Sequence, residues 1–146
     1  MSAGHLVRRF VTSLSRQPPS GDDEAWATGW LCAGEGELWA SMPPADRRHA
    51  VEVTRQFVAR RPQGSRAEVA GALLHDVGKV PSRLGTLGRV AATLVGPRTR
   101  RFRMYHDHEA IGANMAAQAG SEQVTVALIR GTGPAAADLQ AADDSI

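Results

Sequence analysis

The sequence predicts an all-α protein, folded as a single-domain helical bundle of about 6–7 helices. Apolar residues recur every three or four positions through most of the chain, as they do along one face of an amphipathic helix. No two segments show the alternation of apolar and polar residues that is typical of strands. Clusters of proline and glycine divide the chain into pieces of helical length, and 146 residues suit one domain.

Residues 1–20 are predicted to form an N-terminal amphipathic helix and a linker, and residues 21–146 the functional domain. An apolar stripe on one helical face favours docking on the core over binding to a membrane surface. The stripe is made of Leu6, Val7, Phe10, Val11 and Leu14.

The domain is expected to begin with two helices that glycines separate. Asp22 or Asp23 can cap the first helix, which carries two of the three tryptophans. Gly34 and Gly36 are expected to interrupt it, and a short helix follows them.

Two further helices are predicted in the middle of the chain. Prolines start the first, which runs over about Ala45–Arg60. Ser65 and Glu68 have capping-box spacing and start the second helix, because each can bond the other's free backbone amide. That helix is expected to end in an adjacent His-Asp pair, with Gly78 and Pro81 stopping it.

The second half of the chain predicts four more helices around an arginine-rich segment. The segment is interpreted as a solvated face, with a nucleotide contact as the less favoured alternative. The helices cover Thr86–Val95, His106–Ala119, a stretch capped by Ser121 that ends near Gly131, and a last one that Pro134 opens; the arginines are Arg98, Arg100, Arg101 and Arg103.

Composition excludes several classes of protein. A net charge of +2 does not indicate a nucleic-acid binder, so a nucleic acid is ranked last among partners. The single cysteine, Cys32, excludes a disulfide framework and a cysteine-based zinc site. No apolar run has the length of a membrane span, and we expect a cytoplasmic protein.

Four candidate metal ligands lie on separate predicted helices. His75 and Asp76 are adjacent, His49 lies in the preceding helix, and Asp143 lies in the last one. Side chains from several helices of a bundle can converge on one interior point. Two imidazoles and two carboxylates would hold a divalent ion with positions open for water, as in catalytic sites. The only lysine, Lys79, follows the pair closely.

The ordered set of a histidine, a His-Asp pair and a distal aspartate resembles the HD-domain superfamily of metal-dependent phosphohydrolases. Three flanking stretches are similar to segments of that family, and the resemblance covers roughly Ala45–Asp144. They are Leu73–Lys79 around the pair, His108–Ala113, and Leu139–Asp144 at the end.

The resemblance implies that residues 21–146 form an HD-like domain with His49, His75, Asp76 and Asp143 as ligands of a first metal ion. It implies that Asp76 and Lys79 are catalytic, because Lys79 can reach back to a phosphate. The metal is Mn, Fe, Co, Ni, Zn or Mg, which the sequence does not distinguish.

One departure from the family concerns a second metal ion. Arg130 stands where many members have a histidine, and an arginine cannot ligate a metal. His108 matches the other additional position. We therefore expect one metal site in preference to two, with Lys79, His108 and Arg130 binding the substrate phosphate.

Together with the resemblance, these features predict a metal-dependent phosphohydrolase that cleaves a phosphate mono- or diester by metal-activated water. The partner is then a small phosphorylated substrate, with a nucleotide as one candidate. The alternative is a non-catalytic HD-like module with a degraded site that binds a nucleotide or a protein. The sequence leaves the substrate and the oligomeric state open.

Overall fold

The computed structural model describes residues 17–82 and 107–146. These residues form seven α-helices and one 3-10 helix, η1, and within them there is no strand, which confirms the all-α prediction. None of the described helices is long and apolar enough to cross a membrane. The elements are α2 (Gly21–Thr28), α3 (Ala33–Ser41), α4 (Pro44–Arg60), α5 (Arg66–Leu73), η1 (Val77–Ser82), α8 (His108–Gln118), α9 (Gln123–Ile129) and α10 (Ala136–Asp144).

Several predicted features lie outside the described residues. They are the N-terminal amphipathic helix, the helix over residues 86–95, the arginine-rich segment after it, and His106.

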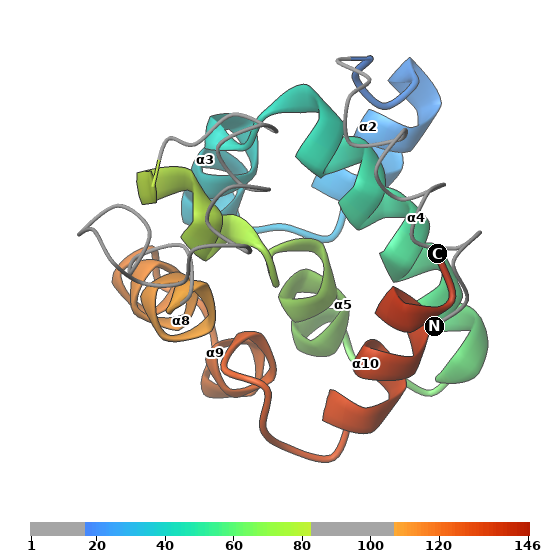
Figure 1. Ribbon diagram of the computed structural model, residues 1–146, viewed down its shortest axis with the longest axis vertical. Helices are drawn as coiled ribbons and strands as arrows, with labels where there is room; N and C mark the ends of the chain where they lie inside the picture. The colour runs from blue at the N-terminus through green and yellow to red at the C-terminus, as the bar shows by residue number, and fades with distance from the viewer. Residues whose placement is uncertain (1–16, 83–106) are drawn as a thin grey trace, which may run out of the picture.

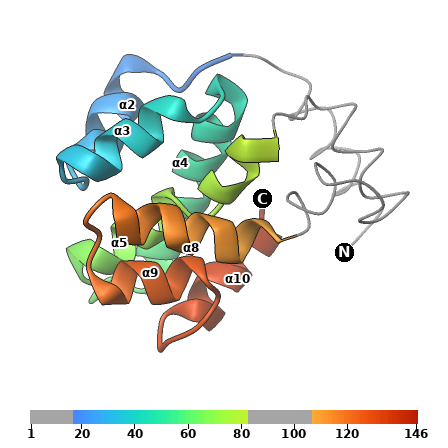
Figure 2. The ribbon, with the colours of Figure 1, turned by 90° about the vertical axis from the view of Figure 1, so that its left-hand side faces the viewer.

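The short helix α5 lies at the centre of the bundle (Figure 1). It packs against α4 and α9, while α10 packs on α4, and α8 packs on both α9 and η1. Figure 2 shows α8 and α9 side by side on one face of the molecule. Every residue of α5 from Ala67 to Leu73 is buried, and most of these side chains are small. Small side chains allow the neighbouring helices to approach α5 closely from several directions.

The core consists of two apolar clusters that meet at α5. The first contains Trp39, Met42 and Leu73, and the second contains Phe57 and Ala72. Leu73 and Ala72 are neighbours in sequence, so two adjacent faces of one helix contribute to the two clusters. One polar bond joins α5 to α9 in this interior, because the buried Thr125 hydroxyl donates to the Ala67 carbonyl at 2.7 Å.

The structure corrects the predicted boundaries of the first two helices. Ser20, and neither Asp22 nor Asp23, caps α2, since the Ser20 hydroxyl accepts from the Asp23 amide at 3.1 Å. Gly34 and Gly36 do not interrupt a helix but lie inside α3. The reason at Gly34 is tertiary: a Cβ there would collide with the backbone of Ala119, just after α8.

The predicted end of the second middle helix is also wrong. Helix α5 ends at Leu73, so the His-Asp pair lies in the turn that follows, and Gly78 and Pro81 lie within η1. Gly78 is needed for a different purpose from the predicted one. A Cβ on Gly78 would overlap the His108 carbonyl oxygen and would stand 2.6 Å from the amide nitrogen of Gly112. The absence of a side chain at Gly78 thus allows η1 to pack directly on the backbone of α8.

Of the two other predicted helix caps, one is present and the other is not. The Ser65–Glu68 capping box is present, with the Ser65 amide donating to the Glu68 carboxylate at 3.0 Å. Ser121 does not cap α9, since Glu122 holds the N-cap position. The Ser121 hydroxyl instead donates to the buried Glu35 carboxylate at 2.7 Å. The helices predicted over Ala45–Arg60 and after Pro134 are confirmed as α4 and α10.

Candidate active site

The four predicted metal ligands come together in the folded chain. Helix α4 carries His49, the turn after α5 carries His75 and Asp76, and α10 carries Asp143. The Asp143 Oδ1 atom lies 3.2 Å from His49 Nε2 and 3.9 Å from His75 Nε2. A single carboxylate oxygen from the last helix therefore faces the imidazoles of two earlier elements.

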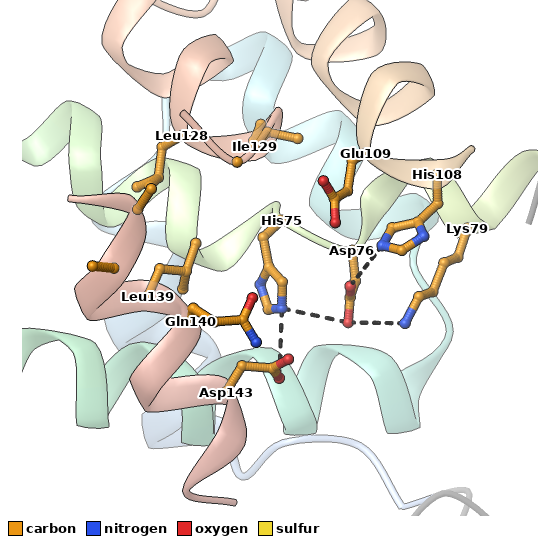
Figure 3. Close-up of a pocket in the computed structure, with 13 residues that line it drawn as sticks. His75, Asp76, Lys79, His108, Glu109, Leu128, Ile129, Leu139, Gln140 and Asp143 are labelled. Carbon is orange, nitrogen blue, oxygen red and sulfur yellow. Dashed lines mark ion pairs between the residues drawn. The ribbon is translucent and has the colours of Figure 1, made fainter. Parts of the chain in front are cut away.

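Asp76 extends this arrangement to two of the three predicted phosphate-binding residues, Lys79 and His108. Its Oδ2 atom lies 3.5 Å from His75 Nε2 and 3.3 Å from Lys79 Nζ, while Oδ1 lies 3.6 Å from His108 Nε2. Figure 3 shows the ion pairs that join His75, Lys79 and His108 to Asp76. The close contact of η1 with α8 at Gly78 brings His108 to the opposite side of Asp76.

The His75 ring is fixed by its backbone partner. Its Nδ1 atom lies 2.7 Å from the Ala72 carbonyl oxygen, a geometry that requires Nδ1 to carry a proton and donate it. Its Nε2 atom is buried and makes no hydrogen bond, although the carboxylates of Asp76 and Asp143 face it. A neutral ring would turn a lone pair toward two anions, so this atom requires a proton or a metal ion.

The pKa values follow from this crowding of charges. Burial alone would lower the pKa of His75, but the carboxylates of Asp76 and Asp143 outweigh it and raise the pKa to about 9. Burial would raise the pKa of Asp76, but the nearby positive charges, His75 first and then Lys79, hold it below its usual range. The pKa of Asp143 is likewise lowered, because the hydrogen bond from His49 and the nearby positive charge of His75 outweigh its burial.

A cavity of about 570 Å³ opens beside these side chains. His75, Asp76, Lys79, His108 and Asp143 line it, so all but one of the residues described above reach its wall. The exception is His49, which joins the site through Asp143. The volume falls within the range of roughly 300–1,000 Å³ that small-molecule sites occupy in proteins.

Arg130 is the one predicted site residue that the structure does not bring to the others. It is exposed at the C-cap of α9, and although Ile129 and Gly131 line the cavity, Arg130 does not. Its predicted phosphate contact therefore has no support from the described geometry.

Two residues with polar side chains that line the cavity, Glu109 and Gln140, were not predicted from the sequence. Glu109 directly follows His108, and Gln140 lies one helical turn before Asp143, so proximity to a candidate was the available signal. The Glu109 Oε2 atom lies 3.2 Å from where a Cβ on Gly131 would stand. Gly131 has φ +88°, so its positive φ makes the turn there and its missing side chain leaves room for the carboxylate.

The donor set fits a divalent metal ion in its chemistry, because imidazole nitrogens and carboxylate oxygens are ligands of such ions. Metal–ligand bonds of about 2.1 Å place neighbouring ligand atoms about 3.0–3.4 Å apart, depending on coordination geometry. Of the observed separations, 3.2 Å lies within that range, and 3.5 and 3.9 Å exceed it. In the described part of the chain, however, no three His, Cys, Asp or Glu side chains surround a common point as they stand. The side chains pair with one another, and metal binding would need small rotations.

Comparisons with known proteins found no match to this chain. No model of a protein family matches the chain, and no curated protein or solved structure matches it.

Proposed function

We propose that this protein is a metal-dependent phosphohydrolase that cleaves a phosphate mono- or diester. The observation that carries the proposal is the setting of His75. Its Nδ1 atom is bound to a backbone carbonyl, as in many metal-ligating histidines, and its buried Nε2 atom faces two carboxylates without a hydrogen bond. The resemblance of the motifs around it to the HD-domain superfamily supports the same function.

His49, His75, Asp76 and Asp143 would hold the ion. An ion bound there would polarise a phosphoryl oxygen and lower the pKa of a water molecule. The protein's own residues would do the rest of the chemistry. Lys79 and His108 flank Asp76 and can bind the non-bridging oxygens of a phosphate in the cavity. Asp76 is ionised and central, so it would hold the ion and orient Lys79 and His108; its lowered pKa makes it a weak base, and the proton of the attacking water would be lost chiefly through the effect of the ion.

The first experiment is metal analysis followed by activity. Protein purified without chelators is analysed for metals, and the chelated protein is assayed on a panel of phosphate mono- and diesters with Mn, Fe, Co, Ni, Zn or Mg. We expect about one bound ion per chain and hydrolysis of at least one ester. Asp143→Asn should lower activity by at least about 100-fold, because it removes a charged ligand from the ion.

Asp144→Asn is the matched control. Asp144 is the next residue of α10 and is exposed, with its carboxylate accepting from Gln140 at 3.0 Å, so its loss should leave activity unchanged. Equal loss of activity in both variants would mean that α10 is simply destabilised. Absence of hydrolysis with every metal would contradict the proposal and favour a non-catalytic HD-like module that binds a nucleotide or a protein.

A further inference from the structure

The cavity has two chemically different ends. The ionic residues Asp76, Lys79 and His108 gather on one side, as Figure 3 shows, and Leu128 and Leu139 stand on the other. Ile129 and two small residues of the first turn of α10, Ala136 and Ala137, complete the apolar end. A ligand that combines an anionic group with an apolar portion would match both ends of the cavity.

The charges that the described residues place at the ionic end favour a single phosphate. Among the described lining residues Lys79 is the only lysine or arginine, whereas Asp76, Glu109 and Asp143 are carboxylates. Lys79 is already paired with Asp76. One phosphate can be neutralised by Lys79, His108 and a divalent ion, but a second would extend toward Glu109 or the apolar end. Neither place offers it a cation within the described wall.

The apolar end has a floor of buried side chains and an exposed rim at Ala137. Leu128 and Ile129 are each 2% exposed and Leu139 is 7% exposed, so the core holds all three in place. Ala137 is exposed and its side chain is short, which leaves room above this base. A hydrocarbon chain in that space would gain about fourfold in affinity for each fully buried methylene group.

We propose that the ligand of this cavity is a phosphomonoester with one phosphate and a short, uncharged, largely apolar alcohol portion. The phosphate lies between Lys79 and His108, and the alcohol carbons lie against Leu128, Leu139 and Ala137. The inference rests on the proposed function for its phosphate end, and on the lining of the cavity for its apolar end.

Binding of stable phosphonates tests the inference without requiring catalysis. Methyl-, propyl- and hexylphosphonate are titrated calorimetrically into the Mn²⁺-loaded protein, together with 3-phosphonopropanoate, which resembles propylphosphonate but carries a terminal carboxylate. Half-burial predicts about a twofold gain per methylene, and so about 30-fold from methyl to hexyl. The carboxylate analogue should bind at least about tenfold more weakly than propylphosphonate.

Ala137→Leu locates the binding of the alkyl chain. Leucine fits an exposed helical position and fills the apolar end, so this variant should lose most of the gain from methyl to hexyl and still bind methylphosphonate. The matched control is Ala117→Leu, an exposed position at the far end of α8 outside the described cavity lining, which should keep the wild-type series.

The outcomes separate this inference from the proposed function. Affinity that does not depend on chain length, an unchanged series in Ala137→Leu, or equal binding of the carboxylate analogue overturns the assigned ligand class. If the phosphonates bind with the expected length dependence while no phosphoester is hydrolysed, the hydrolase proposal fails and the ligand class stands. If no phosphonate binds, the ligand class fails, whatever activity the ester panel records.

Discussion

At the scale of single residues, His75 lies between the two carboxylates of the site, Asp76 and Asp143. Its Nδ1 bond to Ala72 sets the ring, and its Nε2 atom lies 3.5 Å from Asp76 and 3.9 Å from Asp143. The same atom can bind a proton or a metal ion, but not both. The electrostatics of the metal-free protein and its metal affinity are therefore two consequences of one arrangement.

The raised pKa of His75 predicts how the stability of the metal-free protein depends on pH. The pKa rises from 6.5 to about 9 on folding, so the stabilisation is complete below about pH 6.5 and is lost as pH rises through about 9. The lowered pKa values of Asp76 and Asp143 act oppositely, because their contribution is present above about pH 3.8 and lost on acidification. Urea unfolding of chelated protein should show a maximum between these limits, with an alkaline loss on the order of 1–3 kcal/mol.

Two controls assign the alkaline loss to His75. His75→Gln should be less stable near pH 6 and should not lose the same stability between pH 6.5 and 9, since it has no imidazole to deprotonate. A saturating divalent ion should remove the alkaline loss in the wild type, because metal binding requires the deprotonated ring. An alkaline loss that persists in His75→Gln would assign it to another group.

At the scale of elements, the contact of η1 with α8 determines where Lys79 and His108 lie. The backbones meet at Gly78 and Gly112, and neither position has room for a larger side chain without movement of its neighbours. Lys79 is adjacent to the first glycine, and His108 begins the helix that contains the second. Any separation of the two elements would move both residues relative to Asp76.

Gly78→Ala should therefore destabilise the fold and weaken the site together. The added methyl group overlaps the His108 backbone, and we expect a loss of at least about 2 kcal/mol in the free energy of unfolding. Gly36→Ala is the control, because nothing lies within 4 Å of a Cβ there and the residue is inside α3. That change should stabilise by about 0.5–1 kcal/mol. Equal effects in denaturant unfolding would contradict this account of the contact.

At the scale of the whole molecule, the site lies where two pairs of elements meet. One pair is α4 with α10, and the other is η1 with α8, and α5 lies between them. The four metal-ligand candidates come from positions 49, 75, 76 and 143, so a bound ion would link distant parts of the chain. An ion that binds only the folded state stabilises all of these elements together.

Metal binding should consequently raise the thermal stability of the whole domain. At about 100 times the dissociation constant we expect about 2.7 kcal/mol, which corresponds to a rise in Tm of roughly 5–10 °C. Differential scanning calorimetry should show this rise in the wild type and lose it in His49→Gln. His108→Gln should keep it if a single ion is bound. A second, smaller rise that disappears in His108→Gln would instead indicate two ions.

Much of the architecture could be predicted from local pattern. Helical periodicity predicted an all-α bundle, and the Ser65–Glu68 spacing predicted a capping box that is present. Such features depend on residues within one or two helical turns, so a single sequence contains them. The ordered histidines and aspartates also predicted residues that do meet, since adjacent helices of a bundle share one interior.

Only the tertiary structure decided which side chains face the cavity and why certain glycines occur where they do. Arg130 was predicted at the site and is exposed outside the described cavity lining, whereas Glu109 and Gln140 line it. Gly34 and Gly78 were interpreted as helix breaks, but each permits the backbones of two distant elements to approach. The sequence by itself therefore determined the helices and the chemical types of the site residues. Their orientation depends on contacts between residues as far apart as His49 and Asp143, which no local pattern records.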